Sequence, residues 1–473
     1  MPDLPVPAPD PVAPSVAGDA AEVERLRRSV RDRLKDGAPD AIAALFIRRH
    51  PADTALVLDR LTTDETCAVL RALPPALRSA VFGYFTDACQ GDLARCLARR
   101  EFADLVSRMS ADERADLYNR LTEEQQRTLL PALAQAERED IRRLAGYRRG
   151  TAGAVMTSEY ATLTPGVTAR DAIEQLRREA PDKETIYDAY VIDEDRRLLG
   201  VVSLRDLIMA EAEARVADFM VGNPIAAPVD TRSEEIAARI ARYDLHSLPI
   251  IDGDGRLVGI VTQDDAMDVV EQEATEDFHR SATVLPLDGS VRHARLHHLY
   301  RKRVSWLVLL VFGNLLSGAG IALFEDTIAA HITLVFFLPL LIASGGNAGA
   351  QASTLMVRAI ATGDVRMSDW SRMLGREIVV ATALGVTMAL TVSLIGVARG
   401  GVAIAGVVAA TMVLVVLAGS LIGLSLPFIL NRLKLDPATA SGPLVTSIAD
   451  VIGVVTYFAI ATAVLPLGTG AGG

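Results

Sequence analysis

The chain has 473 residues, of which 50% are apolar and 23% are charged, and its formal net charge is −11. Residues 304–473 carry 7 Lys and Arg against 7 Asp and Glu, so the whole net charge belongs to residues 1–303. An acidic soluble part lacks the basic face that nucleic-acid binding requires. Its three cysteines have no CxxC spacing, which excludes a disulfide framework and a zinc site and predicts small buried hydrophobic side chains. We therefore expect a soluble acidic half joined to a membrane half.

The first part of the chain is predicted to be entirely helical after a short tail. Residues 1–20 are rich in proline and alanine and contain no apolar signal core, so we expect a disordered tail there. In residues 21–148, apolar side chains recur every three or four positions, and helix-start signals such as Thr63-Asp64 separate short segments. This pattern predicts an all-α solenoid of short helix pairs, which indicates an interaction module rather than an enzyme.

An internal repeat follows. The segment VMTSEYATLTPGVTARDAIEQLR at Val155 is echoed by FMVGNPIAAPVDTRSEEIAARIA at Phe219, and LLGVVSLRDLI at Leu198 is echoed by LVGIVTQDDAM at Leu257. Each copy reads as strand, helix, β-hairpin and helix. We expect two similar α/β units, at 149–212 and 213–276.

This tandem resembles a pair of cystathionine β-synthase (CBS) domains, which implies a module that senses adenine nucleotides or ions and regulates a neighbouring domain. Ser203, Arg205 and Asp206 resemble the ribose-binding motif of such pairs and make ATP a candidate ligand. A hydroxyl and an Asp three residues apart also form an ordinary helix N-cap. Asp188 stands where an aromatic side chain could stack on adenine, which counts against ATP.

A dense run of carboxylates covers residues 264–277 and leads through a basic segment into the first apolar run. Most charge runs are solvated surfaces, but a metal bound here could pull on the first membrane helix. Carboxylates that face one another across a domain interface repel, and divalent cations would draw the domains together. We expect a connecting helix at 277–303.

Five apolar runs follow, and they predict a membrane domain at 304–473 with five helices. Four runs are long enough to cross a bilayer core of ~30 Å. The second run must continue through SGGNAGAQ at 344–351 as a broken or loosely wound helix. Lys and Arg in the short loops place the soluble domains in the cytoplasm and the C-terminus outside the cytoplasmic membrane. The runs lie at 304–324, 332–342, 378–398, 402–430 and 443–467.

Two features of these runs do not suit a lipid-facing position. Asp450 lies well inside the fifth run, where it should face water, a cation or another polar group. The glycines at 345–349 permit either an unwound backbone that lines a cavity or close helix packing. Together with the amides of Asn347 and Gln351, these groups form a hard-oxygen set suited to Mg²⁺.

The order of these parts resembles the MgtE family of magnesium channels. The most specific elements are PLLIASGGNAGAQAST at Pro339, LDPATASGPLVTSIAD at Leu435 and EATEDFH at Glu273. The resemblance implies a homodimer with a cation pathway between the two membrane domains. It places Asp450 at the central Mg²⁺ site, with Asn347 and Gln351 near it.

The resemblance also implies that cytosolic Mg²⁺ binds acidic residues between the helical and CBS domains and closes the pore through the connecting helix. The residues of this chain that match such positions are Asp112, Asp116, Glu234, Asp244, Asp265, Asp268, Glu273, Glu276 and Asp277. Three positions depart from the family pattern: Ala350 and Gly442 stand where an amide is usual, and Arg232 where an acidic sensor is expected.

Three other functions are weaker. A transporter of Co²⁺, Mn²⁺ or Ni²⁺ would keep the architecture, but no thiolate or imidazole lies near Asp450 in the sequence. A membrane metalloprotease would need an HExxH pair inside an apolar run, whereas His331 lies in an outer loop. A CBS-bearing sensor that moves no ion would not need polar residues inside the second and fifth runs. We therefore expect a membrane-embedded Mg²⁺ channel or transporter, not an enzyme, with Mg²⁺ as both substrate and regulator.

Overall fold

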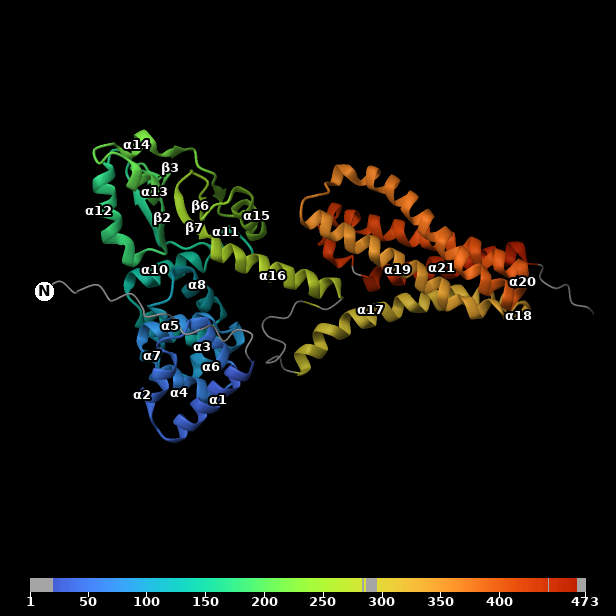
Figure 1. Cartoon of the computed structure of the whole chain (residues 1–473), viewed down its shortest axis with the longest axis horizontal. Helices are drawn as coiled ribbons and strands as arrows, with labels where there is room; N and C mark the ends of the chain where they lie inside the picture. The colour runs from blue at the N-terminus through green and yellow to red at the C-terminus, as the bar shows by residue number, and fades with distance from the viewer. Residues whose placement is uncertain (1–19, 283–284, 286–295, 441, 466–473) are drawn as a thin grey trace, which may run out of the picture. The chain divides into compact units, whose positions relative to one another are not determined.

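The computed structural model describes residues 20–282, 285, 296–440 and 442–465. The chain divides into two compact units whose boundary lies between Glu273 and Ala274. The first unit contains the helical domain and the CBS pair, and the second contains the apolar helices (Figure 1). Residues 1–19 of the predicted tail at 1–20, and residues 283–284 and 286–295 of the expected connecting helix, lie outside the described residues.

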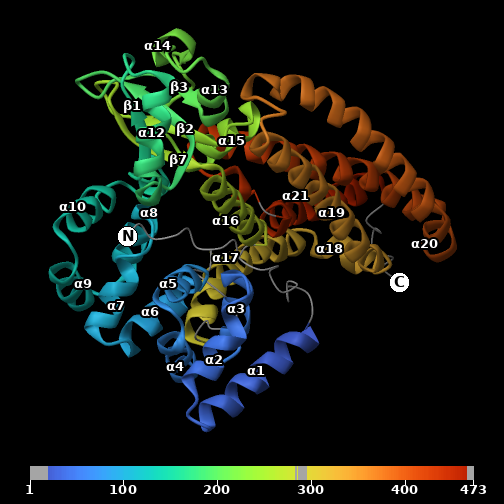
Figure 2. The ribbon, with the colours of Figure 1, turned by 60° about the vertical axis from the view of Figure 1, so that its left-hand side comes forward.

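The helical domain is a solenoid, as predicted. Each helix from α1 to α8 contacts the helix two places further along the chain, and Figure 2 shows the helices in a curved row from blue to teal. The helices begin at capping signals in the sequence: the Thr62 hydroxyl accepts from the Glu65 N–H, and the Glu65 carboxylate accepts from the Thr62 N–H. Their bounds are α1 (Ala20–Lys35), α2 (Pro39–Phe46), α3 (Pro51–Leu58), α4 (Thr63–Ala72), α5 (Pro75–Gly83), α6 (Asp87–Cys96), α7 (Arg99–Val106), α8 (Ala111–Arg120), α9 (Glu123–Leu129) and α10 (Gln135–Leu144).

The cysteines correct one expectation. Cys67 of α4 and Cys96 of α6 are paired as a disulfide, with their Cα atoms 6.6 Å apart, because the solenoid stacks α6 on α4. Cys67 lies in the helical core and Cys89 and Cys96 pack against that core, as predicted, but the pairing of Cys67 with Cys96 was not predicted. Cys89 is free, and burial raises the pKa of its thiol to about 11.

The CBS pair contains two sheets of the same plan, which confirms the repeat. In the first sheet β1 (Tyr160–Leu163) is parallel to β2 (Thr185–Ile192), which is antiparallel to β3 (Leu198–Ser203); β4 (Val221–Gly222) extends this sheet. In the second, β5 (Ala227–Pro228) is parallel to β6 (Ser247–Ile251), which is antiparallel to β7 (Leu257–Thr262). The helices of this pair are α11 (Ala152–Val155), α12 (Ala169–Glu179), α13 (Leu204–Met209), α14 (Val216–Phe219) and α15 (Ser233–Tyr243).

Buried hydroxyl groups join the two repeats. The Tyr190 and Ser247 hydroxyls are hydrogen-bonded at 2.6 Å, and the Tyr160 hydroxyl donates to the Leu257 carbonyl at 3.0 Å. Tyr190 and Ser247 are buried, so these bonds fix one sheet against the other.

The connecting segment differs from the prediction. Helix α16 (Gln263–Ser281) begins directly after β7 and carries the whole carboxylate run, so it belongs to both units. The basic residues at 301–303 lie instead in α17 (Leu296–Ala322), the first long apolar helix. Of the expected helix over 277–303, the described residues belong to the end of α16 and the start of α17, with residues 282 and 285 outside both helices.

The second unit contains four helices that are long and apolar enough to cross a membrane, among the described residues. One of them, α20 (Trp370–Arg432), reverses at Gly401, where φ is +78°. Its halves lie side by side, because Gly385 meets Val413 and Gly396 meets Ala405. The five apolar runs thus form five helical segments. The other helices are α17, α18 (Glu325–Ala330), α19 (Leu334–Ala361) and α21 (Gly442–Val464).

The glycine-rich segment is not broken or loosely wound. It lies inside α19, which is helical from end to end. Gly345 and Gly349 of α19 pack directly against Gly419 and Gly423 of α20, and a Cβ on either α20 glycine would collide with an α19 carbonyl. The glycines therefore serve close helix packing, the alternative that the sequence left open.

Candidate cation and nucleotide sites

The structure brings four of the predicted acidic residues into one cavity of about 250 Å³. Asp112 and Asp116 come from α8, and Asp265 and Asp268 come from α16, more than 140 positions further along the chain. Helix α8 is positioned by the solenoid, and α16 is positioned by the second CBS sheet that it follows. The cavity therefore lies between the helical domain and the CBS pair.

Negative charge in this cavity is poorly compensated. Burial, and to a lesser extent the charge of Asp116, raise the pKa of Asp112 against hydrogen bonds from the backbone and Ser110 that lower it. The Oδ1 atom of Asp112 is buried without a hydrogen-bond partner among the described residues. Burial, and next the charge of Asp112, raise the pKa of Asp265 to about 7. Burial also raises the pKa of Asp116, although the nearby guanidinium of Arg120 opposes the rise. Carboxylates in such a setting are stabilised by a cation.

Three further acids at or near this cavity were missed in the sequence. Asp87 of α6 and Glu113 of α8 line it, and Glu184 lies directly before β2. Partial burial and the charges of Asp112 and Asp265 raise the pKa of Glu184 to about 8. The only signal in the sequence was the position of Glu184 at the start of a strand, and its approach to α8 depends on how the domains pack.

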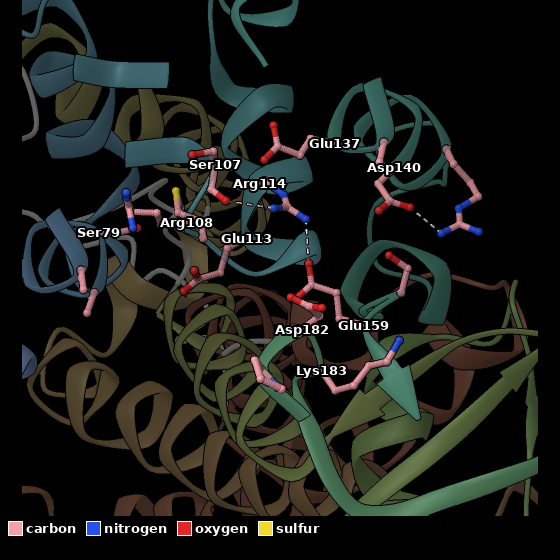
Figure 3. A pocket seen from close by; sticks show the side chains of 17 residues that line it. Ser79, Ser107, Arg108, Glu113, Arg114, Glu137, Asp140, Glu159, Asp182 and Lys183 are labelled. Carbon is pink, nitrogen blue, oxygen red and sulfur yellow. Dashed lines mark hydrogen bonds and ion pairs between the residues drawn. The ribbon is translucent and has the colours of Figure 1, made fainter. Parts of the chain in front are cut away.

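A buried ion pair ties the helical domain to the first CBS repeat. The Arg114 guanidinium donates to the Glu159 carboxylate at 2.7 Å and to the Ser107 carbonyl at 3.4 Å, as the dashed lines in Figure 3 show. The side chain of Arg114 is 7% exposed. This pair lines a second polar cavity of about 880 Å³, next to Glu113, Asp182 and Lys183. Neither partner was singled out from the sequence.

Two predicted regulatory residues lie elsewhere, in or just after α15. The Glu234 carboxylate is paired with the Arg232 guanidinium. Arg232, which stands where an acidic sensor was expected, therefore neutralises Glu234. Asp244 ends α15 in the left-handed conformation, with φ of +51°. Neither side chain lines the cavity that contains Asp112.

The acidic end of α16 makes its own ion pairs. Glu273, Glu276 and Asp277 all lie on this helix. The Arg280 guanidinium pairs with Glu276 at 3.0 Å and also with Asp436, in the turn before α21. Among the described residues, no three His, Cys, Asp or Glu side chains are arranged to hold a metal ion directly.

The predicted nucleotide residues line a cavity of about 620 Å³. The Ser203 hydroxyl accepts from the Asp206 N–H at 3.1 Å and donates to its carboxylate, so this pair forms the N-cap of α13 as well as part of the cavity wall. Arg205 lines the same cavity. An aromatic side chain is present after all: Tyr187, beside Asp188, lies with its ring 6.1 Å from that of His246.

In the membrane half, Asp450 lies on α21 and its Oδ1 atom is buried without a hydrogen-bond partner among the described residues. Asn347 and Gln351 are exposed on α19, one turn apart. Gly346 of α19 packs on Thr446, one turn before Asp450. The structure thus brings the two predicted segments into contact, although no hydrogen bond within the described chain joins the amides to Asp450.

Family models match three parts of the chain. Residues 338–460 match MgtE, described as a divalent cation transporter. Residues 49–150 match the MgtE intracellular N domain, and residues 152–213 and 216–272 match CBS domains.

Curated relatives match over most of their length. The magnesium transporter MgtE of Thermus thermophilus is 36% identical over 447 residues, which cover 93% of this chain and 99% of that protein. The magnesium transporter MgtE of Bacillus subtilis is 33% identical over 428 residues, which cover 87% of this chain and 94% of that protein.

Two solved structures resemble the first unit. The crystal structure of the soluble part of a magnesium transporter has a TM-score of 0.50 and 31% identity, and covers 53% of this chain and 99% of that one. The crystal structure of the cytosolic domain of the Mg²⁺ channel MgtE in complex with ATP has a TM-score of 0.50 and 36% identity, and covers 51% of this chain and 99% of that one.

Proposed function

The chain belongs to the MgtE family of divalent cation transporters, and on this basis we propose that it carries Mg²⁺ into the cell across the cytoplasmic membrane. The transporting form is a homodimer embedded in lipid, with the helical and CBS domains in the cytoplasm and the C-terminus outside. Cytosolic Mg²⁺ closes the pathway.

Asp450 supports the transport proposal most directly. A carboxylate oxygen that is buried in an apolar helix without a hydrogen-bond partner is costly unless a cation or water satisfies it. Two Asp450 side chains across a dimer axis would hold a Mg²⁺ ion that keeps part of its water shell, as this ion prefers. The exposed amides of Asn347 and Gln351 would contact those waters. The membrane potential supplies about 2.3 kcal/mol per charge per 100 mV.

The cavity between the helical and CBS domains supports the regulatory proposal. Asp112, Asp116, Asp265 and Asp268 line it, and their mutual repulsion favours separation of α8 from α16. A hydrated Mg²⁺ ion would neutralise that repulsion through its waters, which agrees with the lack of three directly arranged ligands among the described residues. Cation binding would then hold the two domains together.

ATP is the proposed ligand of the first CBS repeat. The cavity that contains Asp206 offers a carboxylate for ribose hydroxyls, the Arg205 guanidinium for phosphates, and the Tyr187 ring for adenine. The related cytosolic domain solved with ATP shares 36% of its sequence with this chain.

Flux measurements in proteoliposomes test the transport proposal. Wild type and Asp450→Asn would be reconstituted, and Mg²⁺ entry would be followed with a trapped dye, at low and at millimolar Mg²⁺ on the side of the soluble domains. We expect flux in the wild type that millimolar Mg²⁺ suppresses, and little flux in the variant. Flux that survives the substitution would overturn the assignment of Asp450, and flux of Mn²⁺ or Co²⁺ without Mg²⁺ would overturn the proposed selectivity.

A further inference from the structure

Arg280, in the last turn of α16, pairs with two carboxylates at once. One is Glu276, one turn earlier on the same helix, at 3.0 Å. The other is Asp436, 156 positions further along the chain. The side chains of all three residues are about one-third exposed, at 30–33%. An ion pair within one helix turn is common on a protein surface, but the second partner makes this arginine a bridge between separate elements.

Asp436 lies in the turn that precedes α21. Its carboxylate accepts from the Ala438 N–H at 2.8 Å and caps the short 3₁₀ helix Pro437–Thr439. The Ser353 hydroxyl of α19 donates to the Ala440 carbonyl at 2.5 Å and so holds the end of the same turn. This turn leads directly into α21, which carries Asp450. A displacement of Asp436 would therefore move the start of α21, the helix that carries the proposed pore carboxylate of Asp450.

We propose that Arg280 is a built-in counter-cation that holds the end of α16 on the turn before α21 in the absence of a divalent cation. The inference rests on the proposed function and adds a metal-independent part to its regulation. Without the guanidinium, the Glu276 and Asp436 carboxylates would face each other uncompensated and would repel. A divalent cation could then take the place of the arginine.

This assignment changes the role of Glu276. Its carboxylate is occupied by the Arg280 guanidinium, so Mg²⁺ must compete with a tethered cation at this position. The contact between α16 and the turn therefore persists at low Mg²⁺ and restrains the pore before any ion binds. Arg280 acts as a positioning residue, since it touches neither the pathway nor Asp450 through any hydrogen bond or ion pair in the described chain.

Full-length variants in proteoliposomes test the proposal. Arg280→Gln should raise Mg²⁺ flux about two- to fivefold at low Mg²⁺ on the side of the soluble domains, which corresponds to the loss of a partly exposed ion pair. At millimolar Mg²⁺ its flux should return to the wild-type level, because the metal replaces the guanidinium. Arg280→Lys keeps the charge and should stay close to wild type.

Two further variants keep the test decisive. Arg239→Gln is the matched control: Arg239 forms an i,i+4 pair with Glu235 and its side chain is also 32% exposed. Asp436→Asn keeps an oxygen that can accept from the Ala438 N–H but removes the charge, and should raise flux at low Mg²⁺ as Arg280→Gln does. Equal flux in wild type and Arg280→Gln at both concentrations, or an equal rise in the control, would overturn the inference. No Mg²⁺ flux in the wild type would instead defeat the proposed function.

Discussion

Asp265 is a carboxylate whose ionised form destabilises the folded protein. Its Oδ2 atom accepts from the Thr262 hydroxyl at 2.6 Å at the start of α16, which favours the ionised form. Burial and the charge of Asp112 outweigh that bond and raise the pKa of Asp265 to about 7. An unfolded aspartate ionises near pH 3.9. The metal-free fold therefore loses stability as the pH rises from about 4 to 7, and the whole penalty is present above pH 7.

Substitution of Asp265 by Asn should stabilise the metal-free protein at alkaline pH. In EDTA at pH 8 we expect a gain of about 1–2 kcal/mol in the free energy of unfolding, after allowance for partial exposure. The gain should be smaller at pH 5, where the folded wild type keeps the proton. Thermal unfolding of the full chain in detergent measures both values. Asp264→Asn, at the exposed neighbouring position, is the control, and an equal gain there would contradict this explanation.

At the scale of elements, the membrane half depends on the close contact of α19 with the second half of α20. Gly345 and Gly349 on one helix meet Gly419 and Gly423 on the other, so the backbones touch without intervening side chains. Such contact gains van der Waals packing where lipid offers no hydrophobic drive for association. It also fixes α19, and with it Asn347 and Gln351, against the rest of the unit.

A methyl group at Gly423 should separate these helices. The added Cβ would collide with the Gly349 carbonyl, a backbone atom that no rotamer change can move. We expect Gly423→Ala to lower the free energy of unfolding by about 1–3 kcal/mol, measured by thermal unfolding in detergent. Gly406→Ala, in the same half of α20 and with open space around it, should be neutral or stabilising by about 0.5–1 kcal/mol. Similar losses in both variants would show that the close contact is not the cause.

At the scale of the whole molecule, α16 is the element that both units share. Its first turns line the cavity with Asp112, and its last turn pairs with Asp436. The acidic residues that line the cavity and the arginine that pairs with Asp436 thus lie near opposite ends of one helix of 19 residues. Cation binding in the cavity and the ion pair with Asp436 therefore involve residues of the same helix.

Loss of two cavity carboxylates should make closure independent of Mg²⁺. The double variant Asp112→Asn, Asp265→Asn should have a lower Mg²⁺ flux than the wild type at low Mg²⁺, because α8 and α16 no longer repel each other and stay together without a cation. Millimolar Mg²⁺ should lower this flux little further. Glu234→Gln, a predicted sensor that is paired with Arg232, should close like the wild type. Normal closure in the double variant would rule out this cavity as the sensor.

The sequence predicted those parts of the molecule that local pattern determines. Apolar spacing and the internal repeat gave the solenoid, the two sheets and five apolar helical segments. The glycines of α19 were ambiguous, because the same residues permit unwinding or close packing and only their partner glycines on α20 decide between them. The pairs Arg114–Glu159 and Arg280–Asp436 were not predicted, since each joins segments that only the tertiary fold brings together.

The reversal at Gly401 affects how the membrane half inserts into the bilayer. With φ of +78°, this residue occupies a backbone region that side chains disfavour, and no linker separates the two halves of α20. We therefore expect the two halves to enter the bilayer together, as one helical hairpin. Topology tags placed between them would disturb insertion itself, whereas the segment between α19 and α20 offers several residues of chain outside any long helix.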